Sequence, residues 1–356
     1  MTLIRSLNST YGRIVAAYIV ACCTLWIVLL IVLPQAIMAD YSFWHEVTSA
    51  DRATLENNLE KQYVDLQLMD LKIKRLSGGE EGEGESLADL EQLRASLAGE
   101  IAAIEAQLAG QDDGPRQEYT FKNYTNLGER HLGIFLKTLV ASAVVTIVAL
   151  LVCYPVVYYI AKCATPSRAA LIILGLVVPY WVNEILRTFA WLMILSYNGL
   201  LNVFLQSTGL TESPILFLSG NSGVLVGMIY AYILFMVFPI YNTMETLDDN
   251  QLDAARDLGA TSWGIHRDII IPHAKPGIAV GCIMTFMLSA GSYAVPAILG
   301  GTTGDVWFTQ VIYAQFMTSR NWNVGSAYSI MLLLVCLGFV LLVMRIARVR
   351  LQDIVR

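Results

Sequence analysis

Six long apolar segments run through this sequence, and they restrict the fold more than any other feature. Each is long enough to cross a bilayer core of about 30 Å as a helix of roughly 20 residues. None has the alternating pattern of a barrel strand, and only helices or closed barrels satisfy every backbone group inside a bilayer. We therefore predict an all-α membrane protein with spans at about 14–38, 133–161, 169–197, 221–243, 277–299 and 326–345.

The composition agrees with this class, because 56% of the residues are hydrophobic and only 15% are charged, outside the usual range of soluble domains. The first apolar run, of about 25 residues, follows Arg5 and Arg13 and is longer than the core of a cleavable signal peptide, so we expect a retained helix. The cysteines and histidines show no spacing typical of a disulfide framework or a metal site. No basic patch suggests nucleic-acid binding.

Basic residues in the short connecting loops predict the orientation, because cytoplasmic loops carry an excess of Lys and Arg. One side of the membrane would hold Arg5, Arg13, Lys162, Arg168, Arg256, Arg267, Lys275, Arg345, Arg348, Arg350 and Arg356. The short loops of the opposite side, about 198–220 and 300–325, contain only Arg320. We therefore expect both termini to lie in the cytoplasm.

The segment of about 39–132 would then lie outside, in the periplasm. Its apolar residues recur at near-helical spacing in two runs, Leu55, Leu59, Leu66, Met69, Ile73 and Leu76, then Leu87, Leu90, Leu97, Ile101, Ile104 and Leu108. The acidic, glycine-rich 78-GGEEGEGE-85 separates them as a turn. The pattern predicts a helical hairpin over 51–109, either a solvated spacer or a docking surface for an external partner. The predicted domains are 1–38 with the first span, the periplasmic 39–132, and a five-helix core at 133–356.

A polar stretch, 253-DAARDLGATSWGIHRDIIIP-272, interrupts the apolar core within a loop at 244–277. Asp248, Asp249 and Asn250 can cap a short helix that Gly259 ends in the left-handed conformation. Thr261 can cap a second short helix, which we expect Pro272 to end. The small residues Ala254 and Ala255 leave one side thin, so the stretch is suited to a groove on a partner protein. A plain connecting loop is the alternative.

The spacing of this stretch resembles the EAA motif of ATP-binding cassette importer permeases. That pattern is EAA, three residues, G, nine residues, I, one residue, then L and P, and here Asp253 replaces the Glu and Ile271 the Leu. Further motifs resemble the spermidine and putrescine branch of the family, namely Pro155, 179-PYWVNEILRTFAW-191, 198-NGLLN-202, 272-PHAKPGI-278 and 293-YAVPAILGG-301. The resemblance leaves out 39–115.

The resemblance implies a type I importer permease with six transmembrane helices in the bacterial inner membrane. It implies a non-catalytic subunit that forms the path for a small solute, with a polyamine first and an opine, an amino-acid-like compound or a metal ion as alternatives. ATPase-coupling roles are implied for Asp253, Ala254, Ala255, Arg256, Asp257, Gly259, Ala260, Ile269 and Pro272. Implied partners are a cytoplasmic ATPase dimer, a second permease that makes a heterodimer, and a periplasmic solute-binding protein.

ATP and Mg²⁺ would be bound by the ATPase subunit. This sequence contains no Gly-Lys dipeptide and therefore no GxxxxGK[ST] phosphate loop. We accordingly expect no cofactor, no metal and no catalytic residue in this chain.

Two charged residues, Glu184 and Arg187, stand deep within the third predicted span. An intramembrane charge is costly unless it faces a cavity or a partner, so each is a functional hypothesis. A structural ion pair is one alternative, since residues three apart share a helix face. In the other, Glu184 faces the path and attracts an amine together with Tyr180 and Trp181. Pro179 weakens the helix at this point.

The outer mouth of the path is the third candidate region. Tyr293, Asp305 and Trp307 surround a diglycine at 300–301, although aromatic residues near an interface are commonly anchors. Two other classes of protein remain open. A membrane receptor would need a signalling domain, which the 11 residues after the last span do not supply. A secondary transporter would usually show internal repeats, and none is evident.

Overall fold

The computed structural model describes residues 2–47, 87–110, 116–125, 127–300 and 306–348, with isolated positions between 58 and 73. Within these residues the chain is helical apart from one pair of short strands. It divides into two units, one comprising Met1–Ser42 with Tyr124–Arg356 and the other Phe43–Asn123. Among these described residues, six helical stretches are long and apolar enough to cross a membrane, which matches the predicted number of spans: Gly12–Phe43, Glu129–Cys163, Glu184–Ser207, Ser222–Glu245, Ser262–Ala290 and Trp322–Ala347.

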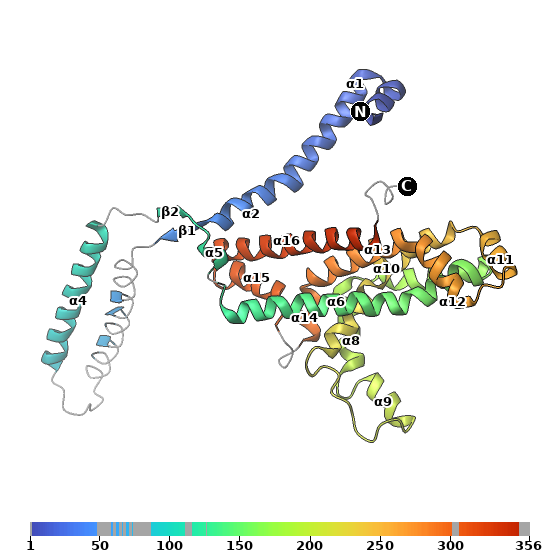
Figure 1. Cartoon of the computed structure of the whole chain (residues 1–356). Coiled ribbons are helices and arrows are strands. Elements are labelled where there is room, and N and C mark those ends of the chain that lie inside the picture. Colours follow the sequence, from blue (N-terminus) through green and yellow to red (C-terminus); the bar gives the residue numbers. More distant parts are fainter. Residues whose placement is uncertain are drawn as a thin grey trace. The chain divides into compact units, whose positions relative to one another are not determined.

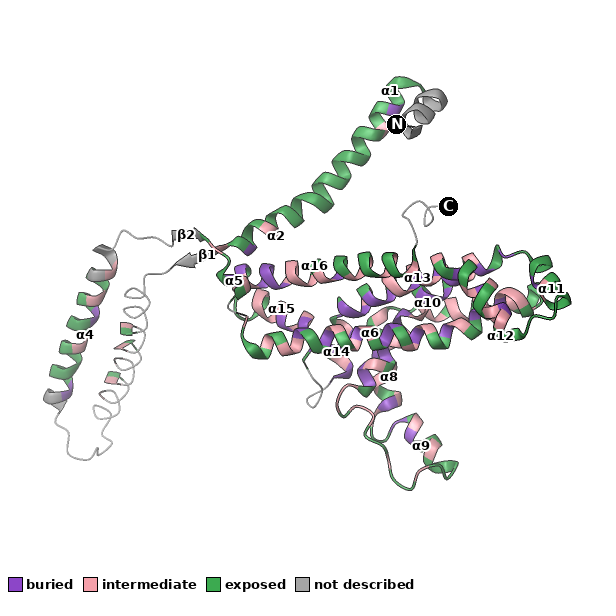
Figure 2. Ribbon diagram, in the orientation of Figure 1, coloured by how far each residue is buried: buried purple, intermediate pink, exposed green. Residues whose placement is uncertain are grey.

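The first of these spans is built from three consecutive helical elements (Figure 1). They are α1 (Thr2–Ile27), the π-helical turn η1 (Val28–Val32) and α2 (Leu33–Phe43). Within α1, Gly12 has a φ of 80° and interrupts the helical backbone. Most of the side chains between 12 and 41 are exposed within this chain (Figure 2). An apolar surface of this extent is stable only against lipid or another protein.

The smaller unit contains the strand pair β1 (Trp44–Val47) and β2 (Arg116–Tyr119), together with α4 (Leu87–Gly110). The strands are antiparallel, with Trp44 opposite Tyr119 and Val47 opposite Arg116. The Asn123 side chain donates to the Trp44 carbonyl at 2.9 Å. The second helix predicted for the hairpin is therefore present as α4. Most of the first, and the 78–85 turn, lie outside the described residues.

The larger unit has a bundle of long helices that pack side by side (Figure 1). They are α6 (Glu129–Tyr158) with its π-helical extension η2 (Tyr159–Cys163), α10 (Ser222–Glu245), α13 (Ile271–Ala290) and α16 (Trp322–Ala347). Its shorter helices include α7 (Pro166–Val177), α8 (Glu184–Leu195), α9 (Leu200–Ser207), α14 (Ala294–Leu299) and α15 (Phe308–Met317). The boundary between the two units falls within α5 (Lys122–Thr125).

Glycine lets α10 and α13 approach closely. A Cβ atom built on Gly277 of α13 would lie 2.2 Å from the Pro239 carbonyl oxygen of α10. Gly281, one turn later, faces the backbone and sulfur of Met236. The buried residues accordingly gather on α10, α13 and the inner face of α6, whereas much of α16 is exposed (Figure 2). Small residues at helix contacts are typical of packing inside membranes.

The predicted third span, 169–197, is wrong as a continuous helix. The chain instead forms α7, a 3-10 turn η3 (Val178–Trp181), a break at Val182 and Asn183, and then α8. Pro179 lacks the N–H that a continuous helix needs. The Asn183 side chain accepts from the backbone N–H of Ile185 at 2.8 Å and thereby starts a new helix. Glu184 consequently occupies the first turn of α8, not the middle of a span.

The predicted fifth span, 277–299, also differs from the structure. The long helix begins earlier, α13 ends at Ala290, and α14 follows after a break at 291–293. Gly291 caps α13, where its N–H donates to the Met287 carbonyl at 3.0 Å. The residues placed at the outer mouth thus lie after the end of this helix.

Candidate functional site

The interhelical segment, residues 248–270, connects α10 to α13 and contains most of the EAA-like motif. It forms α11 (Asp249–Asp257), α12 (Ser262–Ile265) and a π-helical turn η4 (His266–Ile270). Asp248 Oδ1 accepts from the backbone N–H of Asn250 at 3.0 Å, and Thr261 Oγ1 from that of Gly264 at 3.2 Å. The first predicted short helix, the helix start after Thr261 and both side-chain caps are therefore confirmed.

Gly259 ends α11 in the left-handed region, with a φ of 78°. Its N–H donates to the Arg256 carbonyl at 2.9 Å, and the Ala260 N–H donates to the Ala255 carbonyl at 3.0 Å. These two bonds make a Schellman motif, which satisfies the last carbonyls of a helix. The glycine of the motif is therefore required by backbone conformation.

Replacing Gly259 with valine should lower the free energy of unfolding by about 1–2 kcal/mol, since left-handed backbone is strained for a side chain with a Cβ. Apart from the glycine and its two chain neighbours, no atom of the described residues lies within 4 Å of the position where that Cβ would stand. The variant therefore tests backbone strain without a steric clash. Gly259→Asn should cost less, because Asn tolerates this region. Thermal unfolding of the purified permease measures both. Gly175→Val, at a helical glycine with equally open surroundings, is the control, and an equal loss there would contradict the explanation.

The prediction that Pro272 ends the second helix is wrong. The chain stays helical through η4 into α13, and Pro272 lies in the first turn of α13. Proline is tolerated there because the N–H groups of a first turn have no partner within the helix. The interhelical segment is consequently continuous with the bundle helix that follows it.

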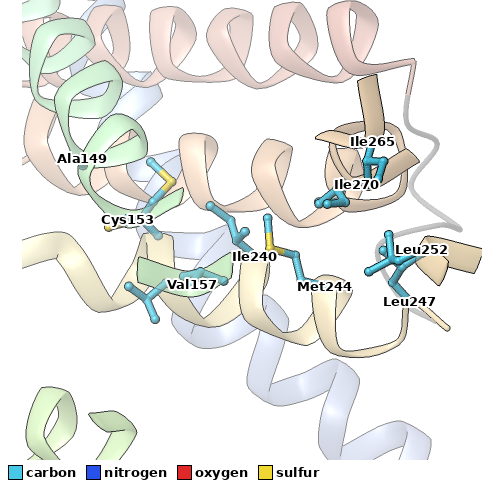
Figure 3. Close-up of a cluster of buried hydrophobic side chains, with 12 residues drawn as sticks. Ala149, Cys153, Val157, Ile240, Met244, Leu247, Leu252, Ile265 and Ile270 are labelled. Carbon is cyan, nitrogen blue, oxygen red and sulfur yellow. The ribbon is translucent and has the colours of Figure 1, made fainter. Parts of the chain in front are cut away.

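One side of the interhelical segment is anchored in a hydrophobic core. Leu252, Ile265 and Ile270 are buried in a cluster that also contains residues of α6, α10 and α13 (Figure 3). Ile269 and Ala255 pack partly against the same cluster. The other predicted coupling residues, Asp253, Ala254, Arg256, Asp257, Ala260 and Pro272, are exposed.

Two large apolar side chains on this segment point outward, and the sequence reasoning did not select them. Leu258 is 89% exposed and Trp263 is 72% exposed. They flank the turn at Gly259, near the exposed Arg256–Asp253 ion pair at 2.8 Å. Exposed aromatic anchors with a charged rim are typical of protein interfaces. The sequence did contain a signal for them, because both are apolar residues at positions that the predicted caps place outside the hydrophobic core.

The second candidate region is the charged cluster, which consists of Tyr180, Glu184, Arg187, Tyr230, Tyr232 and Ser292. The Tyr232 hydroxyl donates to Glu184 Oε1 at 3.1 Å and lies 2.9 Å from Ser292 Oγ. Tyr180 donates to the Tyr230 carbonyl at 2.6 Å. Elements η3, α8, α10 and the break after α13 thus meet here. The sequence analysis did not select three members of this cluster, Tyr230, Tyr232 and Ser292. The signal that could have identified the two tyrosines is their position within an apolar span.

Arg187 is held by aromatic rings. Its Cζ atom lies 4.1 Å from the centre of the Tyr180 ring and 6.0 Å from that of Tyr230, a cation–π arrangement. Its Nε and Nη1 atoms are buried without a hydrogen-bond partner in the part of the chain that the structure describes. Within that part no ion pair joins Arg187 to Glu184. The Glu184 carboxylate is therefore not neutralised by its neighbour.

The remaining candidate path residues are not among those that form the charged cluster. Trp181 is 81% exposed, and Trp307 is only 2% exposed, packed in the core cluster that includes Tyr232 and Leu299. Tyr293 is partly exposed and its ring lies 4.7 Å from that of Tyr313. Asp305 lies outside the described residues. Among the described residues no group of His, Cys, Asp and Glu could hold a metal.

Comparison with known families and proteins agrees with these features. Residues 164–352 match the family described as binding-protein-dependent transport system inner membrane component. The spermidine/putrescine transport system permease protein PotB of Escherichia coli (strain K12) is 36% identical over 226 residues, which cover 63% of this chain and 81% of that protein. The protein of the same name from Haemophilus influenzae is 35% identical over 212 residues, covering 59% and 73%.

Among solved structures, a bacterial transporter that imports the acidic polysaccharide alginate has a similar fold. The TM-score is 0.50 with 17% sequence identity, and the match covers 73% of this chain and 97% of that chain. An identity this low shows the fold alone.

Proposed function

Because the chain belongs to the family of binding-protein-dependent transport system inner membrane components, we propose that it carries a polyamine of the spermidine or putrescine type across the inner membrane. It is the permease subunit of an ATP-binding cassette importer, a multi-pass membrane protein with permease relatives. Two PotB relatives that are 36% and 35% identical and are named for spermidine and putrescine support this substrate class.

The observation that carries the substrate assignment is the unneutralised carboxylate of Glu184. It stands at the broken third span, with hydroxyl and aromatic groups of Tyr232 and Tyr180 nearby. A protonated amine satisfies a carboxylate by charge and hydrogen bonding and is attracted to tyrosine ring faces. The chain leaves the helical conformation between η3 and α8, and membrane proteins tolerate such a break inside the bilayer where a cavity or a partner is present. Glu184 is therefore the group we assign to the polyamine.

The interhelical segment supplies the connection to ATP hydrolysis. In this proposal the loops rich in Lys and Arg, both termini and the interhelical segment face the cytoplasm. An ATPase subunit, which binds ATP and Mg²⁺, grips the exposed face around Leu258, Gly259 and Trp263. Closure of the ATPase displaces the segment and shifts the bundle between outward and inward access. The size of this shift is set by the difference in ATPase affinity for the two states. A second permease and a periplasmic binding protein complete the importer.

Replacing Glu184 with glutamine tests the substrate assignment. The change keeps the shape but removes the charge, so uptake of labelled spermidine by the complete importer should fall roughly tenfold, as expected for loss of a charge-assisted hydrogen bond. Uptake is measured in membrane vesicles that hold the ATPase and binding protein. Glu212→Gln, at an exposed carboxylate beyond α9, is the matched control and should leave uptake unchanged.

Two results would count against the proposal. Unchanged rate and affinity in the Glu184 variant would remove this residue from the path. Failure of the wild-type importer to take up any polyamine, while ATP hydrolysis proceeds with another solute, would overturn the substrate class and leave the permease role intact.

A further inference from the structure

Three residues of α6 and its extension η2 lie four positions apart and contact both ends of the interhelical segment. We call Tyr154, Tyr158 and Lys162 the α6 stripe. Four-residue spacing places side chains on one helix face. The contacts join residues that are 85 to 112 positions apart in the sequence.

Lys162 holds the first end of the segment. Its ammonium donates to the Leu247 carbonyl at 2.5 Å and to Asp249 Oδ1 at 2.8 Å. The Lys162 side chain is only 5% exposed, whereas that of Asp249 is 76% exposed. Lysine is rarely this buried unless it is paired. The ammonium also lies at the C-terminal end of α10, where positive charge is favoured by the helix dipole.

The two tyrosines hold the second end. The Tyr154 hydroxyl lies 2.9 Å from Nδ1 of His266, the first residue of η4. The Tyr158 ring packs edge-on against the His266 ring, with centroids 4.5 Å apart and an interplanar angle of 64°. The imidazole is therefore located by a hydrogen bond on one side and a ring on the other.

Between these two attachment points, buried side chains of α6 and of the interhelical segment pack in one cluster. Cys153 and Val157 of α6 are buried against a cluster that contains Leu252, Ile265 and Ile270 of the segment (Figure 3). Because protein interiors are close-packed and have low compressibility, a displacement of one packed element is transmitted to its neighbour. Both elements also contain π-helical turns, η2 and η4, which are common at functional sites in helices.

We propose that the α6 stripe is a clamp that makes α6 move with the interhelical segment when the ATPase displaces it. The proposal rests on the coupling role given to the segment under the proposed function. In this proposal Lys162, Tyr154 and Tyr158 are positioning residues: they touch neither nucleotide nor solute and act through their contacts with Leu247, Asp249 and His266. Without the clamp, the ATPase would still grip the segment, but α6 would follow less completely.

The test uses the complete importer in proteoliposomes, with the double variant Lys162→Met and Tyr154→Phe. Methionine keeps the length of the lysine stem without its donors, and phenylalanine removes only the hydroxyl. We expect the ATPase to co-purify normally and to hydrolyse ATP, while spermidine molecules moved per ATP fall about tenfold, within the range known for coupling mutations. Using Lys162→Arg in place of Lys162→Met keeps the charge and the donors, so the number of spermidine molecules moved per ATP should be partly restored.

Matched controls are Lys275→Met and Tyr159→Phe, at an exposed lysine of α13 and an exposed tyrosine adjacent to the stripe. Both should leave the ratio unchanged. An unchanged ratio in the double variant would overturn the clamp. Loss of ATPase co-purification would overturn it too, because the stripe would then shape the docking surface. If the double variant does not accumulate, the single Tyr154→Phe variant decides by the same ratio.

The clamp and the proposed function fail in different ways. If the interhelical segment does not couple to an ATPase, the wild-type chain itself recruits no ATPase. If only the clamp is wrong, the wild type and the variants recruit the ATPase and transport spermidine with the same ratio.

Discussion

Replacing Gly277 with alanine is expected to prevent most of the protein molecules from folding. The added Cβ would stand 2.2 Å from both the Pro239 carbonyl oxygen and Thr243 Oγ1. The carbonyl belongs to the backbone of α10 and cannot move unless the helix moves. Overpacking typically costs about 1–3 kcal/mol, and more where backbone must shift. Accumulation and thermal unfolding of the detergent-solubilised permease measure the loss.

Gly338→Ala is the matched control for this prediction. Gly338 lies in α16, and no atom of another described element stands within 4 Å of the position of its added Cβ. Alanine is a better helix former than glycine by about 1 kcal/mol, so this variant should be as stable as the wild type or more so. A Gly277→Ala permease as stable as the wild type would show that α10 and α13 are not held as closely as described.

Removing the two exposed apolar side chains of the interhelical segment is expected to detach the ATPase subunit that we propose binds there. Leu258 and Trp263 are 89% and 72% exposed. Buried interface anchors commonly contribute 2 kcal/mol or more each, so Leu258→Ala with Trp263→Ala should weaken ATPase binding by about a thousandfold. Co-purification at decreasing ATPase concentration measures the affinity. Folding should be unaffected, because neither side chain is buried within this chain.

The control for this pair is Leu210→Ala, at a 70% exposed leucine outside the interhelical segment. It removes an equally exposed apolar side chain and should leave ATPase binding intact. If the Leu258 and Trp263 double variant retains full affinity, the exposed face around Gly259 is not the docking surface.

Local chemistry predicted much of this molecule. The number of spans, the short helix α11 and the caps at Asp248 and Thr261 follow from hydropathy and hydrogen-bonding chemistry, which act over one or two turns. The backbone of Gly259 follows for the same reason, because a capping glycine is a local requirement. The motif spacing also pointed to the family that the comparisons show.

Errors in the prediction came where several local signals compete. Pro179 was read as a possible bend in a continuous span, but the Asn183 cap turns it into a break. Pro272 was read as the end of a helix, although it occupies the first turn of α13. Proline disfavours a helix interior and is tolerated at a helix start. Whether a proline interrupts a helix or occupies its first turn depends on where the following helix packs. The residues next to the proline do not determine that packing.

Hydropathy, capping and spacing are properties of contiguous residues, and by themselves they determined the membrane class, the helical segments and the shape of the interhelical segment. The tertiary structure alone decided which side chains meet. Tyr232 reaches Glu184, and Lys162 reaches Asp249, across 48 and 87 positions of sequence. Arg187 lies over the Tyr180 ring and, among the residues that the structure describes, forms no ion pair with Glu184. Such pairings follow from the close packing of distant helices, so no periodicity along one segment can reveal them.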